Sequence, residues 1–279
     1  MSTFQAALQA ENPLQIIGTI NAYCAIMAEK TGYRAIYLSG AGCANASYGL
    51  PDLGMTSLDN VCDDVRRITS ITHLPLLVDM DTGWGNELNV ERSVSQLIKA
   101  GAKAAHIEDQ VAAKRCGHRD NKMLVEIPEM VARLHAAIAG KKNADFYLIA
   151  RTDAMASEGM DGVIKRAEAY VKAGAEAIFA EAFYTLKDYE IFCKHISVPV
   201  LANITEFGKT PLFTVAELKS AGVQFILYPL SAFRAMNHAA LAVFQSIRKN
   251  GTQKNMIDQM QDRKTLYDFL DYESKEPRA

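Results

Sequence analysis

Short apolar runs recur along the chain and are separated by longer stretches with helical periodicity. The runs predict eight strands, near residues 14–20, 35–39, 75–81, 104–109, 146–152, 177–181, 199–204 and 225–229. Between them, segments such as LDNVCDDVRRIT and GVIKRAEAYVKA repeat apolar residues every three or four positions, which predicts amphipathic helices. Strand and helix therefore alternate, as they do in a parallel sheet that helices cover.

A similar sequence motif occurs at four of the predicted helix-to-strand connections: KTGYRAIYLSG, KAGAKAAHIED, KAGAEAIFAEA and SAGVQFILYPL. In each copy a glycine stands where a left-handed residue commonly ends a helix, and an apolar run follows. Eight strand–helix units in this length favour an α/β fold of the closed (β/α)8 barrel type, the TIM barrel. A doubly wound open sheet is the alternative.

No Pro-, Gly- or Ser-rich linker divides the 279 residues, so we expect one α/β domain over 1–279. Its barrel is expected at about 12–245, and a C-terminal helical segment at about 252–273. The formal net charge of -2, without a basic stripe, argues against nucleic acid as a partner. No signal peptide and no apolar run of membrane-spanning length are apparent, so we expect a cytoplasmic protein without a membrane partner.

Polar side chains gather where the predicted strands end. They are Ser39, Asp79, Asp81, Glu108, Asp109, Arg151, Asp153, Glu181, Asn203, Thr205, Ser231 and Arg234. Strand ends of a barrel meet at one mouth, where barrel enzymes build their active sites. Any exposed loop is polar, but that interpretation predicts Lys, Ser and Gly more than paired carboxylates and arginines. The pattern therefore favours an active site.

Two of these acids, Asp79 and Asp81 in VDMDTG, stand two positions apart, so on a strand both would point into the mouth. Neighbouring carboxylates repel and raise each other's pKa, which a divalent cation relieves. Oxygen ligands favour Mg²⁺, with Mn²⁺ as the alternative. Ion pairing of the two acids with arginines is the other interpretation.

The segment KRCGH places Cys116 beside Lys114 and Arg115, whose positive charges favour the ionised thiol. The five cysteines are odd in number and include no CxxC pair, which argues against a disulfide framework and a structural zinc site. Thiol chemistry is the better interpretation.

Arginines and neutral donors complete the predicted mouth. Arg151, Arg234 and, farther along, Arg263 can make forked contacts to carboxylates. Asn203 and Thr205 add neutral hydrogen-bonding groups. A metal, several cations and a thiol together suit a small polycarboxylate substrate.

Seven motifs, KRCGH, YLSGAG, GLPDLG, VDMDTGWG, ARTDA, ANITEFG and YPLSAFRAMN, resemble those of the isocitrate lyase and phosphoenolpyruvate mutase superfamily. The resemblance runs from ENPLQIIGTINA to GTQKNMID and is greatest to the branch of lyases that act on 2-methylisocitrate. The mutase and decarboxylase branches generally lack the cysteine of KRCGH. Isocitrate lyases are considerably longer, so the chain length favours the methylated substrate.

The resemblance implies a Mg²⁺-dependent barrel enzyme, usually a homotetramer, in which a C-terminal helix swaps between subunits. It implies a metal site at Asp79, Asp81 and Glu108, and catalytic roles for Cys116 and Tyr37. The implied substrate-binding residues are Ser39, Gly40, Ala41, Asp52, Lys114, Arg115, Gly117, His118, Arg151, Glu181, Asn203, Ile204, Thr205, Arg234 and Arg263. Ala41 departs from the pattern, because the family usually has glycine there.

The implied reaction is a retro-aldol cleavage of 2-methylisocitrate, a small tricarboxylate, into pyruvate and succinate, as in propionate breakdown by the methylcitrate cycle. A base, Tyr37 assisted by Asp52 or a bound water, takes the hydroxyl proton, and Cys116 protonates the succinate carbon. The alternatives are isocitrate or oxaloacetate as substrate, or a non-catalytic polycarboxylate-binding protein. His106, inside a predicted strand, is expected to be a core histidine with its hydrogen bonds satisfied.

Overall fold

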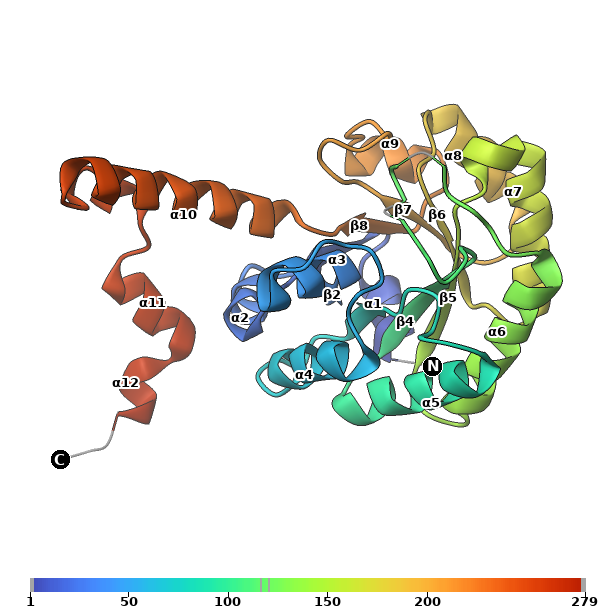
Figure 1. Cartoon of the computed structure of the whole chain (residues 1–279), viewed down its shortest axis with the longest axis horizontal. Helices are drawn as coiled ribbons and strands as arrows, with labels where there is room; N and C mark the ends of the chain where they lie inside the picture. The colour runs from blue at the N-terminus through green and yellow to red at the C-terminus, as the bar shows by residue number, and fades with distance from the viewer. Residues whose placement is uncertain (1–2, 116, 120, 277–279) are drawn as a thin grey trace.

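Eight parallel strands close into a barrel in the computed structural model, which describes residues 3–115, 117–119 and 121–276 (Figure 1). The strands are β1 (Leu14–Gly18), β2 (Ala35–Leu38), β3 (Leu76–Asp79), β4 (Ala104–Glu108), β5 (Tyr147–Thr152), β6 (Ala177–Ala180), β7 (Val200–Asn203) and β8 (Phe225–Tyr228). Each strand pairs with its neighbours in the chain, and β1 pairs with β8 to close the ring. The predicted (β/α)8 barrel is confirmed, and the open doubly wound sheet is wrong.

Closure of the ring depends on Gly18 at the end of β1. A Cβ atom there would lie 1.7 Å from the carbonyl oxygen of Pro229, which follows β8. No real Cβ comes that close, so only glycine lets these two chain segments meet. The register that results pairs Leu14 with Phe225 and Ile17 with Tyr228.

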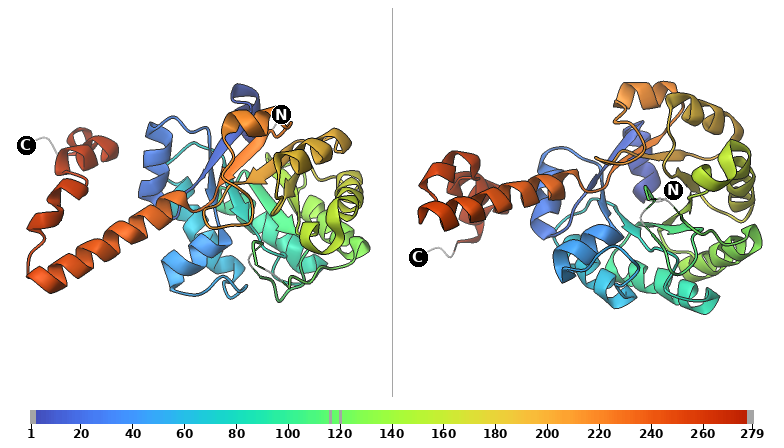
Figure 2. Two further views of the ribbon diagram at one scale, coloured as in Figure 1. Left: turned by 90° about the horizontal axis from the view of Figure 1, so that it is seen from above. Right: turned by 45° about the horizontal axis from the view of Figure 1, so that its top comes forward.

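Helices surround the barrel: most cover its outer face, the first lies at its lower end, and a short one follows β2 at the carboxyl ends of the strands (Figures 1 and 2). They are α1 (Thr3–Ala10), α2 (Ala22–Lys30), α3 (Gly40–Gly42), α4 (Leu58–Thr69), α5 (Glu87–Ala100), α6 (Ile127–Lys141), α7 (Met155–Lys172), α8 (Leu186–His195) and α9 (Val215–Ser220), with a π-helical turn η1 (Cys43–Ser47) after α3. Capping boxes at Ser57, Thr185 and Thr214 begin α4, α8 and α9. The glycines of the four-fold motif, Gly32, Gly101, Gly174 and Gly222, have φ of +93°, +107°, +103° and +91°, as predicted.

Apolar side chains form two layers. Residues such as Leu77, Ile149 and Phe225 fill the barrel interior, and Phe4 of α1 closes its lower end. A larger layer lies between the strands and the surrounding helices. The lower end is therefore sealed by apolar packing, and the polar strand ends face the opposite opening.

The C-terminal part of the chain leaves the barrel. Helix α10 (Ser231–Asn250) extends away from it and is followed by a 3₁₀ turn η2 (Lys254–Gln259), α11 (Arg263–Leu270) and α12 (Tyr272–Lys275) (Figures 1 and 2). No residue of α10 is buried within the described chain, whereas α11 contacts α2, where Lys30 Nζ donates to the carbonyl oxygen of Asp268 at 2.6 Å. Among the described residues, no helix has the length and apolarity needed to span a membrane.

Candidate active site

A cavity of about 330 Å³ opens at the carboxyl ends of the strands, near the lower end of the ~300–1,000 Å³ range of small-molecule sites. Many residues predicted from the sequence line it: Tyr37, Ser39, Ala41, Asp52, Asp79, Lys114, Gly117, His118, Arg151, Glu181, Asn203, Thr205 and Arg234. They come from every part of the barrel, so the parallel topology alone brings them together. The predicted mouth exists.

Arg151, at the end of β5, is the central cation of the site. Its Nε and Nη2 bind the two oxygens of Asp153 at 3.0 and 3.1 Å, its Nη1 lies 3.3 Å from Glu108, and its Nη2 lies 3.5 Å from Glu181. Burial alone would lower the pKa of Arg151, but the three carboxylates raise it well above its ordinary value. The guanidinium is therefore charged and held in one orientation.

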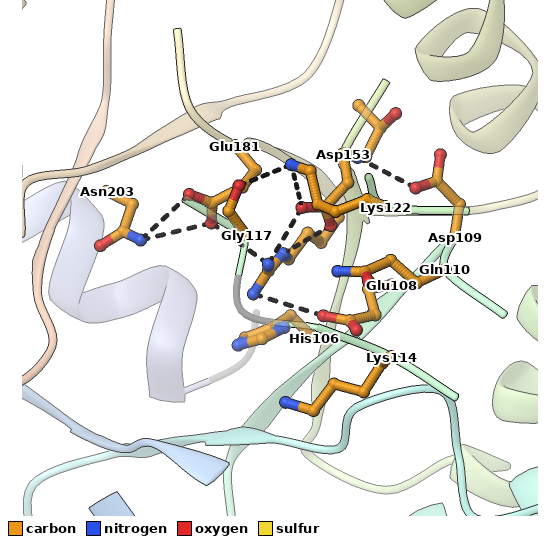
Figure 3. A network of polar contacts seen from close by, with 12 residues as sticks. His106, Glu108, Asp109, Gln110, Lys114, Gly117, Lys122, Asp153, Glu181 and Asn203 are labelled. Carbon is orange, nitrogen blue, oxygen red and sulfur yellow. Dashed lines mark hydrogen bonds and ion pairs between the residues drawn. The ribbon is translucent and has the colours of Figure 1, made fainter. Parts of the chain in front are cut away.

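Glu181, just after β6, is a buried carboxylate that stays ionised. Burial acts to raise its pKa, but Arg151, the hydrogen bond from His118 and the charge of Lys122 outweigh it, and the pKa lies well below its usual range. The amide of Asn203 adds contacts of 3.3 and 3.4 Å (Figure 3). The site thus holds a fixed negative charge beside its central cation.

Asp79 and Asp81 both approach Gly40, although Asp81 is not on the strand. β3 ends at Asp79, and Asp81 lies in a turn with φ of +48°, donating its N–H to Asp79 at 3.0 Å. The prediction that strand alternation aligns the two acids is wrong, because a turn brings them together instead. A Cβ on Gly40 would lie 3.1 Å from Asp79 and 3.2 Å from Asp81.

The charges of these two acids differ. Burial acts to raise the pKa of Asp79, but His106, Lys114 and Arg151 lower it to about 2. Burial, and next the Asp79 charge, raise the pKa of Asp81 to about 7, although Lys114 lies only 2.6 Å away. Asp79 is therefore ionised at neutral pH, whereas the pKa of Asp81 lies close to neutral pH, and a bound cation would relieve the remaining repulsion between the two acids.

The donor set suits a hard divalent cation. Among the described residues, the buried Glu108 Oε1 has no polar partner, while Asp81 Oδ1 and Glu108 Oε2 form ion pairs with Lys114 at 2.6 Å and Arg151 at 3.3 Å. Within the described chain, no three His, Cys, Asp or Glu side chains converge on one point. All candidate ligands are oxygens, and Mg²⁺ typically takes few carboxylates and several waters. The residues fit a Mg²⁺ ion that is bound partly through water.

Tyr37, which lies on β2 and lines the cavity, is a neutral phenol. Burial, and then the charge of Asp79, raise its pKa well above the ordinary value of 10. Its hydroxyl lies 2.9 Å from His106 Nε2 and 3.4 Å from Asp79. His106 was expected to be fully hydrogen-bonded, but its buried Nδ1 has no partner among the described residues, so that expectation is wrong.

Lys114 connects the KRCGH segment to the acids. Its buried ammonium lies 2.6 Å from both Asp52 and Asp81. The adjacent Arg115 is exposed, does not line the cavity, and is held only through its backbone by Gln110. Cys116, predicted to be the catalytic thiol, lies outside the described residues.

Gly117 and His118 lie directly against the charged side chains of Arg151 and Glu181. A Cβ on Gly117 would come within 2.3 Å of Arg151 and 2.6 Å of Glu181, so this close approach requires glycine. His118 Nδ1 accepts the Lys209 N–H at 3.0 Å, which places the ring proton on Nε2, 2.8 Å from Glu181. His118 therefore ties β6 to the loop after β7.

Six of the described residues predicted to bind substrate or metal do not line the cavity: Asp81, Glu108 and Arg115, described above, and Gly40, Ile204 and Arg263. Gly40 and Ile204 are buried beside the cavity and do not line it. Arg263 begins α11, outside the barrel, and does not reach the cavity of its own chain. Arg263 lies outside the barrel because α10 leads the chain away from the cavity.

Sequence reasoning missed several lining residues, namely Arg119, Phe179, Glu206, Phe207, Gly208, Pro229 and Leu230. Phe179 could have been found, because it precedes Glu181 by two positions on the same strand end and shares its face. Phe207 gives no such signal: it is 94% exposed, in a loop, and packs on the Arg234 guanidinium at 5.5 Å. Only the fold brings these two together.

Comparison with known proteins agrees with this geometry. The family model of phosphoenolpyruvate phosphomutase matches residues 4–248. The fold of a solved 2,3-dimethylmalate lyase, described as a member of the PEP mutase/isocitrate lyase superfamily, matches with a TM-score of 0.90 at 29% identity, covering 99% of this chain and 94% of that one. The chain belongs to the phosphoenolpyruvate mutase/isocitrate lyase superfamily.

Within this superfamily the chain is similar to curated 2-methylisocitrate lyases. It is 58% identical to the one from Escherichia coli (strain K12) over 270 residues, 96% of this chain and 91% of that protein. A solved complex of phosphonopyruvate hydrolase with oxalate and Mg²⁺ also matches, with a TM-score of 0.85 at 30% identity over 99% of this chain and 97% of that one.

Proposed function

We propose that this chain is a carbon–carbon lyase that cleaves 2-methylisocitrate into pyruvate and succinate. The observation that carries the proposal is the similarity to 2-methylisocitrate lyases along 96% of the chain, combined with an intact cavity of matching chemistry. Arg151, Lys114 and Arg234 supply cations for carboxylates, and Asn203 and Thr205 supply neutral donors. A non-catalytic binding protein would not require this combination.

The metal we propose is Mg²⁺, held by Asp79 and Asp81, with Glu108 behind them. When bound, such an ion supplies positive charge that polarises the substrate oxygen. The buried Glu108 Oε1, which has no polar partner among the described residues, supports this assignment. Ser39, with the backbone of Gly40 and Ala41, is proposed to receive the keto-acid carboxylate beside this site.

The cleavage we propose begins with loss of the substrate hydroxyl proton. Tyr37 is a neutral phenol, so it orients the substrate oxygen by donating a hydrogen bond. Asp52, a carboxylate paired with Lys114 on the cavity wall, takes the proton. The carbon–carbon bond breaks, the C–O bond becomes the ketone of pyruvate, and the electron pair moves into the neighbouring carboxylate.

The resulting dianionic aci-succinate carries new charge near Arg151 and the Asn203 amide. Both groups are already oriented before the reaction, so stabilising that charge costs little reorganisation. Cys116 then donates its proton to the carbanionic carbon, and succinate forms. The proton balance closes when Asp52 returns its proton to water and the thiol is reprotonated.

Turnover of the purified chain tests this proposal. We expect Mg²⁺-dependent pyruvate release from 2-methylisocitrate with kcat/KM at least about 10-fold higher than for isocitrate, since one methyl group in a fitted pocket contributes that order of discrimination. A chelator should abolish the activity and Mg²⁺ should restore it. Equal rates for both substrates would contradict the assignment, and with no turnover of either, oxaloacetate becomes the next candidate.

We also propose a homotetramer in which the C-terminal helices pack on other subunits. Helix α10 exposes Leu241, Phe244 and Ile247 at 55, 68 and 42%. Grouped apolar residues of this kind usually mark an interface. A mass four times 30.7 kDa is expected in light scattering. Phe244→Asp should shift it to smaller species, and a monomeric wild-type protein would contradict the proposal.

A further inference from the structure

Lys122 is a buried lysine next to the catalytic cavity that the reaction outlined above does not use. Its ammonium donates to the carbonyl oxygen of Gly117 at 2.6 Å and to Asp153 Oδ1 at 2.9 Å (Figure 3). The side chain is only 5% exposed. A lysine loses considerable side-chain entropy and hydration when it is fixed in this way, so the contacts must compensate.

Asp153 is the carboxylate that Lys122 shares with Arg151. The two oxygens of Asp153 receive Arg151 Nε and Nη2, and its own N–H donates to Asp109 at 2.9 Å. Tyr170 in turn donates to Asp109 at 2.9 Å. Asp153 is therefore held from several sides, and any group bound to it is fixed relative to the cavity.

The local charge balance also requires Lys122. Arg151 faces three buried carboxylates, those of Glu108, Asp153 and Glu181. Lys122 pairs with Asp153 and so supplies a second cation on that side. Buried charges are stable only when they are paired, so loss of this ammonium would leave Asp153 competing for Arg151 alone.

Gly117 links the contacts of Lys122 to the cavity, because its carbonyl accepts from Lys122 and the residue lines the cavity. Its backbone lies so close to Arg151 and Glu181 that a Cβ atom would overlap them. The next residue, His118, is held by its contact with Glu181 at 2.8 Å. The Gly117–His118 segment is thus held at two points: Lys122 binds the Gly117 carbonyl, and the His118 side chain contacts Glu181.

We propose that Lys122 is a positioning residue for the lyase reaction, which ties the Gly117 carbonyl to Asp153 and so sets where the Gly117–His118 segment lies against Arg151 and Glu181. This inference rests on the proposed function for its catalytic meaning. The two contacts that Lys122 itself makes, to Gly117 and Asp153, involve none of the proposed metal ligands. A small shift of a reacting group is enough to reduce turnover about 100-fold.

Lys122→Met tests the inference, with Lys141→Met as the matched control. Lys141, at the end of α6, also pairs with a carboxylate, Glu176 at 2.6 Å, but on the opposite side of the barrel from the cavity. We expect Lys122→Met to lower kcat by about 10- to 100-fold with KM changed by less than about threefold. Lys141→Met should keep the wild-type kcat and lose less thermal stability than Lys122→Met, because its ion pair is more exposed.

A second measurement separates this inference from the proposed function. Hydrogen exchange of the Gly117 and His118 amides should be faster in Lys122→Met than in wild type, and unchanged in Lys141→Met, whether or not 2-methylisocitrate is the substrate. Wild-type protein without turnover would overturn the proposed function and leave the exchange result as the test of positioning. Unchanged exchange, or kcat within about threefold of wild type, would overturn the positioning role.

If Lys122→Met does not fold, Lys122→Arg replaces it. A guanidinium keeps the charge but is planar and longer, so it cannot occupy the same point between the Gly117 carbonyl and Asp153. We expect a folded Lys122→Arg protein with kcat lowered by about three- to tenfold. A folded Lys122→Arg protein with the full wild-type kcat and exchange rates would overturn the inference.

Discussion

Replacing Cys116 with serine is expected to lower kcat for 2-methylisocitrate cleavage by about 10³-fold, within the range that general acid catalysis contributes. A serine hydroxyl has nearly the same size, but it is a far weaker acid than a thiol near neutral pH. Lys114 lies in the same segment, with its ammonium fixed between Asp52 and Asp81. Because binding does not depend on the thiol proton, KM should change little.

Steady-state kinetics of Cys116→Ser, beside Cys193→Ser, measures this effect. The Cys193 thiol, on α8, is removed from the cavity, and burial raises its pKa to about 12, so its replacement should leave kcat unchanged. A Cys116→Ser enzyme that keeps more than about a tenth of the wild-type kcat would show that another group protonates the product carbon.

Arg151→Lys is expected to lower kcat/KM by about 10²- to 10³-fold, the usual cost of losing one preorganised stabiliser of developing charge. The substitution keeps the positive charge. It removes the fork that binds both oxygens of Asp153 while also reaching Glu108 and Glu181. A single ammonium cannot satisfy three carboxylates in this geometry.

The control for this substitution is Arg166→Lys on α7. Arg166 is also a forked, buried arginine, bound to Glu158 at 2.6 and 2.8 Å, but it does not line the cavity. It should lose thermal stability and keep kcat within about threefold of wild type. If Arg151→Lys behaved like Arg166→Lys, the role of Arg151 would be structural.

The sequence was sufficient for the barrel because each unit repeats the same local signals. Gly101 and Gly174 illustrate this, since each ends a helix in the left-handed conformation and starts the next strand at the predicted place. The strand-end rule then collected seven of the twenty cavity residues without any knowledge of side-chain contacts: Ser39, Asp79, Arg151, Glu181, Asn203, Thr205 and Arg234. Periodicity and topology are sufficient for both results.

Features that depend on loops could not be predicted in the same way. Asp81 reaches the site through a turn with positive φ, which strand alternation does not describe. Arg115 is exposed and its neighbour Lys114 is buried because of how the segment that contains both residues lies against the cavity. Lys122 gave no signal at all, because its partner Asp153 is 31 residues away in the chain. Such contacts arise only from tertiary structure.

The outward course of α10 has a consequence for how the enzyme behaves in dilute solution. Arg263 follows that helix and lies away from the cavity of its own chain, so under the proposed assembly a neighbouring subunit completes each site. Mass action then links catalysis to subunit association. Specific activity becomes a function of protein concentration: it falls as subunits separate, and initial rates rise more steeply than in proportion to the amount of enzyme added.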